Sequence, residues 1–78
     1  MTIQELRTML RVQPFRPFDI HLADGRSISV NHPEFVGETP SGRIVGVGTP
    51  HGFEIVDLFL VTSLKPRSNG TRRRRSSS

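Results

Sequence analysis

The stretch Phe18–Val30 alternates apolar and polar residues on both sides of an Asp24-Gly25 pair. A period of two is typical of half-buried strands, and Asp-Gly between two such runs indicates a β-hairpin. We expect a type I′ turn, whose two central residues need positive φ angles that glycine adopts without strain. The apolar face of the hairpin, which further strands must cover, consists of Phe18, Ile20, Leu22, Ile28 and Val30.

The residues before this hairpin predict a short N-terminal helix. Thr2 and Glu5 have the spacing of a capping box, in which each side chain accepts a hydrogen bond from the backbone N–H of the other residue. Apolar residues recur at helical spacing from Ile3 to Leu10, and Pro14 ends the pattern. A helix of roughly ten residues is not stable alone in water, so we expect it to dock on the sheet.

The second half of the chain predicts three further strands, at Arg43–Val47, Phe53–Val56 and Val61–Leu64. Ahead of them, Pro33 indicates one short helical turn, and residues 37–42 have the composition of a loop. Alternation fails after Asp57, which we expect to cap a single 3₁₀ turn before the last strand. The five phenylalanines of the chain are expected to belong to the core.

This order of elements is typical of a small SH3-like β-barrel. We therefore predict a mainly-β fold over residues 1–64, with an N-terminal helix and a barrel of five strands. From Lys65 onward the apolar pattern stops, and the sequence becomes rich in arginine and serine. Such a segment has nothing to bury, so residues 65–78 are expected to form a disordered basic tail.

Charge is distributed unevenly between these two parts. Residues 1–64 hold five arginines and seven acidic residues, whereas residues 65–78 hold six basic residues and no acidic one. The resulting net charges are −2 and +6, which together give the +4 of the whole chain. This distribution of charge, a mildly acidic domain followed by a basic tail, affects association and solubility rather than the fold.

Composition narrows the class of protein further. The 78 residues include no cysteine, which excludes disulfides and thiolate metal sites, and only 33% of them are hydrophobic. A core this small often gains stability from oligomerisation. Met1–Val12 carries charged residues inside its apolar pattern, unlike a signal peptide, and no stretch approaches transmembrane length. We therefore expect a cytoplasmic protein.

The residues that could carry out chemistry form no recognisable site. The spacing of His21, His32 and His51 matches no zinc signature, and no serine stands in a nucleophile-elbow motif. The glycines have the wrong spacing for a phosphate-binding loop, and no helix follows them. We therefore expect a non-catalytic protein without a cofactor or a metal ion.

The segment Leu58–Val61 is the candidate interface. Its four apolar residues, Leu58, Phe59, Leu60 and Val61, cannot all point into one small barrel. Apolar surface left outside a core is typical of an interface, and open strand edges favour pairing with another chain. We therefore predict a protein-interaction or self-assembly module that forms a symmetric homo-oligomer, with a dimer favoured.

The arginine run near the C-terminus gives the alternative function. Guanidinium groups bind phosphate bidentately, so Arg72, Arg73, Arg74 and Arg75 predict non-specific binding of RNA or DNA. The chain has no tyrosine or tryptophan on which bases could stack. A solvated tail that only increases solubility is the other interpretation of the same residues.

Three stretches of the chain, PFRPFDIHLADGR, NHPEFV and FEIVDLFLVTSL, resemble a family of short bacterial proteins to which no function is assigned. Planctomycetes are a common source of this family. The resemblance extends over residues 1–64. It implies no activity, so the function is argued from the residues themselves.

The order of helix, hairpin and closing strand also resembles the Sm-like RNA-binding family. Sm-like proteins bind RNA through an Asp-x-aromatic-x-Asn pattern after the second strand and a basic, glycine-containing loop before the last strand. They form rings by pairing the fourth strand of one subunit with the fifth of the next. Asn31–Phe35 and Val56–Phe59 stand at the two RNA-binding places and match neither pattern. The resemblance therefore implies a barrel, but neither ring assembly nor RNA binding of that kind.

Overall fold

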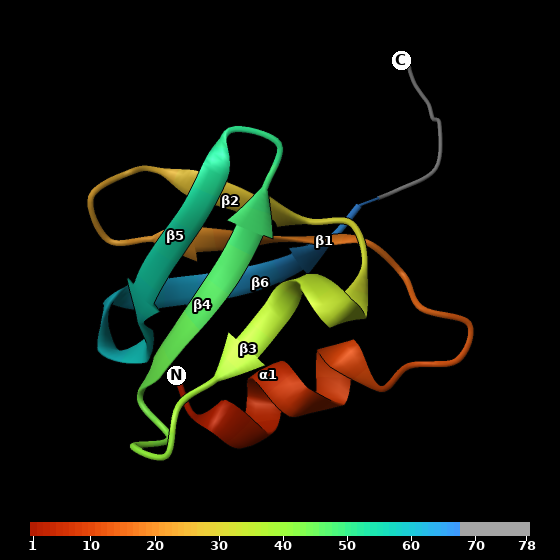
Figure 1. Cartoon of the computed structure of the whole chain (residues 1–78), viewed down its shortest axis with the longest axis horizontal. Coiled ribbons are helices and arrows are strands. Elements are labelled where there is room, and N and C mark those ends of the chain that lie inside the picture. The colour runs from red at the N-terminus through yellow and green to blue at the C-terminus, as the bar shows by residue number, and fades with distance from the viewer. Residues whose placement is uncertain (68–78) are drawn as a thin grey trace.

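Six strands form two antiparallel sheets in the computed structural model, which describes residues 1–67 of the chain (Figure 1). The strand order is β2-β1-β6 in one sheet and β3-β4-β5 in the other. The strands are β1 (Phe18–Leu22), β2 (Ser27–Val30), β3 (Val36–Glu38), β4 (Ile44–Thr49), β5 (Gly52–Asp57) and β6 (Val61–Pro66). The helical elements are α1 (Ile3–Leu10) and the 3₁₀ turns η1 (Pro33–Phe35) and η2 (Leu58–Leu60).

The predicted capping box at the start of α1 is confirmed. The Thr2 N–H donates to Glu5 Oε1 at 2.9 Å, and the Glu5 N–H donates to Thr2 Oγ1 at 3.4 Å. These two bonds satisfy backbone donors that a helix N-terminus otherwise leaves without a partner. Leu6 is fully buried, so the helix docks on the sheets through its apolar face as expected.

The predicted hairpin of β1 and β2 is confirmed, with Ile20 opposite Ile28. Its turn differs from the expected type I′ turn. The Gly25 N–H donates to the Leu22 carbonyl at 3.0 Å, and the Leu22 N–H donates to the Arg26 carbonyl at 2.9 Å. The loop therefore has three residues, and Gly25 ends it with a φ angle of +92°. Glycine is still required there, because other residues rarely adopt a positive φ.

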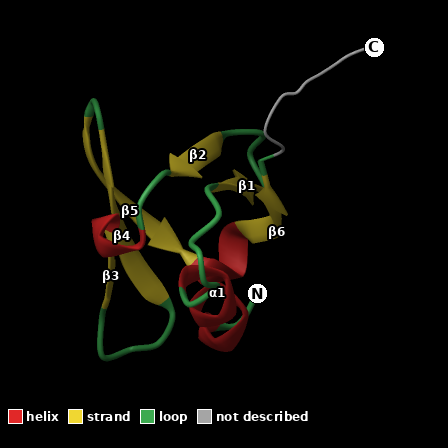
Figure 2. Ribbon diagram, turned by 90° about the vertical axis from the view of Figure 1, so that its right-hand side faces the viewer, coloured by secondary structure: helices red, strands yellow, loops and turns green. Residues whose placement is uncertain are grey.

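The mainly-β fold with an N-terminal helix is confirmed, but the two sheets are not closed into the predicted five-stranded barrel. Figure 2 shows β3, β4 and β5 on one side of the molecule, β1, β2 and β6 on the other, and α1 below. The additional strand is β3, where Gly37 lies opposite Gly46. Its three residues are too few to show alternation, and their glycine and charge favour a loop, so pairing with β4 forms this strand.

Strand β6 extends two residues beyond the predicted end at Leu64. Lys65 lies opposite Asp19, and Pro66 lies opposite Phe18. The folded part of the chain therefore includes residues that the sequence pattern assigns to the tail. Residues 68–78, including the arginine run, lie outside the described part.

Both sheets, α1 and η2 contribute to one buried core. All five residues of the predicted hairpin face belong to it, as the alternation requires. The eleven buried apolar residues are Leu6, Phe18, Ile20, Leu22, Ile28, Val30, Val45, Val47, Val56, Leu58 and Val61.

Candidate interface on an exposed apolar sheet face

The four predicted interface residues divide between the core and the surface. Leu58 and Val61 are only 1% and 7% exposed, whereas Phe59 and Leu60 are 70% and 55% exposed. The Phe59 N–H donates to Asp57 Oδ1 at 2.9 Å, which confirms the predicted cap of η2. This turn directs Leu58 into the core and leaves the next two side chains outside.

The most exposed large apolar side chains besides Phe59 lie on β5. Phe53 and Ile55 are 67% and 64% exposed, whereas Val56 between the sheets is buried. Alternation along β5 thus places its more apolar set of residues outside and Val56 inside. The prediction that all five phenylalanines belong to the core is wrong, because Phe53, Phe35 and Phe59 are exposed.

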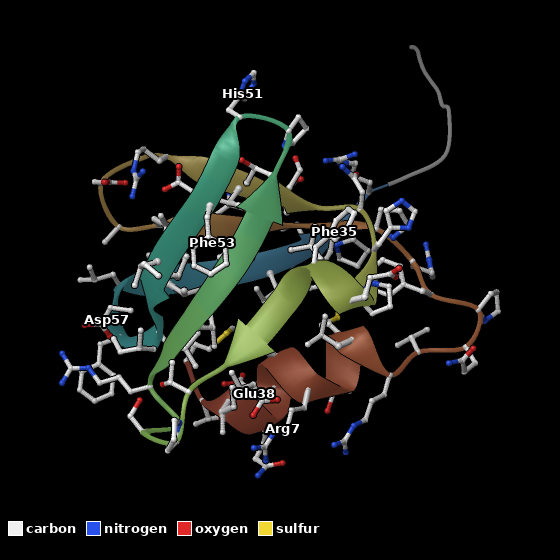
Figure 3. The ribbon with its side chains drawn as sticks, viewed as in Figure 1. Arg7, Phe35, Glu38, His51, Phe53 and Asp57 are labelled. Carbon is white, nitrogen blue, oxygen red and sulfur yellow. The ribbon has the colours of Figure 1, made fainter. Side chains whose placement is uncertain are left out.

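Two glycines of β4, Gly46 and Gly48, lie next to these side chains on the same side of the sheet. Gly46 lies opposite Ile55, and Gly48 lies opposite Phe53, so the exposed face of β4 has no side chain at these two positions. The Phe53 ring lies over Gly46, where a Cβ atom would stand 2.9 Å from the Phe53 Cε2 atom. Figure 3 shows this ring in front of β4. The missing Cβ lets the tip of the aromatic ring come close to the backbone of β4.

Phe35 extends the apolar surface beyond β4. Its Cβ atom lies 3.8 Å from the place that a Cβ of Gly48 would occupy. The His32 ring packs edge-on against the Phe35 ring at 5.1 Å between centroids. Figure 3 shows Phe35 and Phe53 on the same side of the molecule.

At the other end of β5, the ion pair of Arg43 and Asp57 lies against the ring of Phe59. Arg43 Nη2 and Nε donate to the Asp57 carboxylate at 2.7 and 3.0 Å. The guanidinium carbon of Arg43 lies 4.2 Å from the centre of the Phe59 ring, within range of a cation–π interaction. The bond from Arg43 and the Phe59 N–H lower the pKa of Asp57. We call the whole surface the β4–β5 face, defined by Phe35, Phe53, Ile55 and Phe59.

Leu60, the remaining exposed residue of the predicted interface, lies apart from this face. It lines a small hollow with Leu22, Ala23, Asp24 and Arg26 at the turn of the β1–β2 hairpin. The Ala23 N–H donates to the Leu60 carbonyl at 2.8 Å, which fixes η2 against that turn. Of the four predicted residues, Phe59 alone contributes to the β4–β5 face.

Strand β5 forms one edge of its sheet, because β4 is the only strand it pairs with among residues 1–67. The Leu58 N–H donates to the Arg43 carbonyl at 2.8 Å. This bond shows which residue pairs between β4 and β5 are the hydrogen-bonded ones. Hydrogen-bonded pairs recur at every second residue in an antiparallel ladder. The backbone groups of Glu54 and Val56 therefore point toward β4, and those of Phe53 and Ile55 point toward the open edge.

Most basic side chains of the described part are held in ion pairs. Arg7 pairs with Glu38 at 2.7 Å, and Arg67 pairs with Asp19 at 3.1 Å. Arg26 lies 3.0 Å from Asp24 and 3.5 Å from Glu54. The seven basic and seven acidic residues of positions 1–67 balance. The predicted nucleic-acid residues Arg72–Arg75 lie outside the described part.

The histidines do not converge on a common site. His51 stands at the tip of the β4–β5 hairpin in Figure 3, and His32 packs on Phe35. Within residues 1–67, no group of three histidine or acidic side chains is placed to hold a metal ion. The same part of the chain contains no helix with the length and apolarity needed to cross a membrane.

Sequence patterns could have indicated part of the β4–β5 face. The glycines at positions 46 and 48 alternate with valines along β4, which shows that one side of this strand carries no side chain at these two positions. Alternation along β5 gives the period but not the side that is buried. No protein-family model, no curated protein and no solved structure matches this chain, so the resemblances to the planctomycete family and to Sm-like proteins remain predictions.

Proposed function

We propose that this chain is a non-catalytic protein-interaction module that assembles with copies of itself through the β4–β5 face. The observation that supports this proposal is the exposure of three phenylalanines and one isoleucine along the β3-β4-β5 sheet of a domain with a small core: Phe53 and Ile55 on β5, Phe35 beside Gly48, and Phe59 under Arg43 at the end of β5. Contiguous apolar surface of this kind is typical of interaction sites. Phenylalanine and arginine are also enriched at interface cores, and Arg43 stacks on Phe59.

The size of the face is a large part of what an interface needs. A large aromatic side chain buries about 150–250 Å², so these partly exposed residues present on the order of 500 Å² of apolar surface per copy. Standard interfaces bury about 800 Å² on each partner. The β4–β5 face together with a few neighbouring residues therefore approaches the size of an interface.

The test measures molar mass by light scattering at protein concentrations from about 1 to 100 micromolar. We expect the mass to rise from monomer to dimer over this range. The double variant Phe53→Ser/Ile55→Ser should remain monomeric, because it removes the centre of the face. Both side chains are already exposed, so their loss should leave the fold intact.

Val12→Ser is the matched control, since Val12 is an exposed apolar residue that follows α1 and lies outside the face. This variant should associate like the wild type. A wild-type protein that stays monomeric throughout the range would disprove self-association. A double variant that associates normally would show that another surface is responsible.

Non-specific nucleic-acid binding is the second candidate function. Residues 1–67 carry no net charge, so the +4 of the chain comes entirely from Arg72–Arg75. Lys65 and Arg67 lie in or beside β6, and Arg67 is paired with Asp19, which leaves the four-arginine run as the candidate phosphate-binding segment.

A further inference from the structure

We propose that two copies of this chain pair antiparallel along the open edges of their β5 strands, with Ile55 of one copy opposite Ile55 of the other. This inference rests on the proposed self-association and specifies its geometry. It joins the two β3-β4-β5 sheets into one continuous sheet across the dimer. The two β4–β5 faces then lie side by side, and the pairing covers only the β5 side chains next to the axis, above all Ile55.

The backbone of β5 is suited to accept such a partner. The phase of the β4–β5 ladder leaves the N–H and C=O groups of Phe53 and Ile55 directed away from β4. Strand β5 has six residues, which is long enough for a stable ladder, and it contains no proline. An unpaired edge of this length is a ready template for a second strand.

Symmetry limits the possible registers of the pair. In an antiparallel pair related by a two-fold axis, one residue lies opposite its own copy. The two registers that pair most of β5 place the axis at Glu54 or at Ile55. The first would set two carboxylates directly opposite each other, which is destabilising, whereas the second sets two isoleucines opposite each other.

The Ile55 register also matches the chemistry on both sides of the axis. It places Phe53 opposite the partner's Asp57, which is bound by Arg43 beside Phe59. Phe53 thus stands opposite a carboxylate that Arg43 already compensates, rather than opposite an unpaired charge. Glu54, which already pairs with Arg26, lies opposite Val56 rather than another charge.

A single introduced cysteine tests this register, because the chain has no cysteine of its own. In a hydrogen-bonded antiparallel pair the two Cα atoms lie about 5.5 Å apart, within the range of disulfides. Under mild oxidation, Ile55→Cys should therefore form a disulfide dimer on a non-reducing gel. The effective concentration in the dimer should make this reaction about tenfold or more faster than in denaturant.

Phe53→Cys is the matched control, since Phe53 lies on the same face and is equally exposed. Its cysteine would lie opposite Asp57 of the other copy, far from its own equivalent, so it should cross-link no faster than in denaturant. Glu54→Cys tests the rival register and should behave like the control. Circular dichroism of each variant confirms that the fold is kept, and light scattering of the reduced variant at the concentration used confirms that it still forms a dimer.

The possible failures can be told apart. If light scattering shows no dimer, the proposed function fails first. If a dimer forms but Ile55→Cys does not cross-link faster than both controls, self-association stands and the β5 pairing is wrong. Faster cross-linking of Phe53→Cys or Glu54→Cys would place the axis elsewhere. Masses above that of a dimer would indicate head-to-tail assembly and would also overturn the symmetric pair.

Discussion

A glycine in the middle of β4 determines how the most prominent exposed ring is held. Gly46 leaves room for Phe53, whose Cε2 atom would stand 2.9 Å from a Cβ added there. The neighbouring Gly48 has no such constraint, because a Cβ there would meet only Phe35 atoms at 3.7 and 3.8 Å. Substitutions at these two glycines can therefore test the position of the Phe53 ring without replacing Phe53 itself.

Replacing Gly46 with alanine should displace the Phe53 ring from the sheet while the fold remains. The ring is already exposed and can rotate outward, and alanine is better than glycine in a strand by about 0.5–1 kcal/mol. We expect the free energy of unfolding to change by less than about 1 kcal/mol. Self-association measured by light scattering should weaken, because a displaced ring changes the shape of the β4–β5 face.

Gly48→Ala serves as the control for this change. It adds the same methyl group two residues away without touching Phe53, so its melting temperature and its association should both resemble the wild type. Equal effects of the two substitutions on association would show that the position of the Phe53 ring over Gly46 is unimportant.

At the scale of elements, one ion pair connects α1 to the edge strand β3. Arg7 Nη2 donates to Glu38 Oε1 at 2.7 Å, and Arg7 Nε lies 3.1 Å from both carboxylate oxygens. The bond from Arg7 lowers the pKa of Glu38 from its ordinary value of 4.5. This contact joins α1 to the last residue of β3, a strand of only three residues.

Glu38→Gln should reduce the loss of stability at acidic pH. The folded state binds the proton of Glu38 more weakly than the unfolded state, so this carboxylate stabilises the fold above about pH 4.5. Its contribution is lost as the pH falls through the lowered pKa. Melting temperatures measured from neutral pH to about pH 2 should therefore fall less steeply in the variant.

The control for this prediction is Glu34→Gln in η1, because Glu34 makes no ion pair within the described residues. It removes the same charge without removing the contact to Arg7. If this variant and Glu38→Gln have the same pH profile, the ion pair does not contribute to acid sensitivity.

Local patterns predicted those elements that are stabilised by local interactions. The capping box, the Asp57 cap and the β1–β2 hairpin each depend on residues a few positions apart, and all three are confirmed. Strand β3 and the outward orientation of Phe53 depend instead on pairing with β4 and on the glycines across the ladder. Such non-local contacts do not appear in the periodicity of a single segment.

At the scale of the whole molecule, the boundary between domain and tail lies further along than the apolar pattern indicates. The Arg67 N–H donates to the Pro17 carbonyl at 2.9 Å, and the Arg67 side chain bonds Asp19 and Asn31 at 3.1 Å. These contacts fasten the end of β6 to the start of β1. The sequence could not reveal them, because Lys65 and Arg67 look like the beginning of the basic run.

Two truncations test this boundary. A chain that ends at Leu64 loses the last two residues of β6 and the contacts of Arg67, and should be less stable by about 1–3 kcal/mol, the contribution of a few hydrogen bonds. A chain that ends at Arg67 keeps all of them and should melt at the temperature of the full chain. Equal melting temperatures for both truncations would place the boundary at Leu64.

The Arg67 truncation also tests the second candidate function. If Arg72–Arg75 bind phosphates, the full chain should bind duplex DNA weakly and without sequence preference. Four neutralised phosphates predict a slope of log affinity against log salt of about −3 to −4. The chain ending at Arg67, which has no net charge, should not bind. Binding by the truncated chain would locate the site on the folded domain instead.

The position of the Phe53 ring over Gly46 also affects the entropy of association. Ordering a free side chain at an interface costs about 0.5–1.5 kcal/mol, and this cost is subtracted from the affinity. A ring that already rests on the sheet has lost much of its rotational freedom before a second copy arrives. Because Gly46 has no methyl group, the isolated protein can hold its binding surface in the bound conformation. We expect this effect to appear mainly in the rate of dissociation.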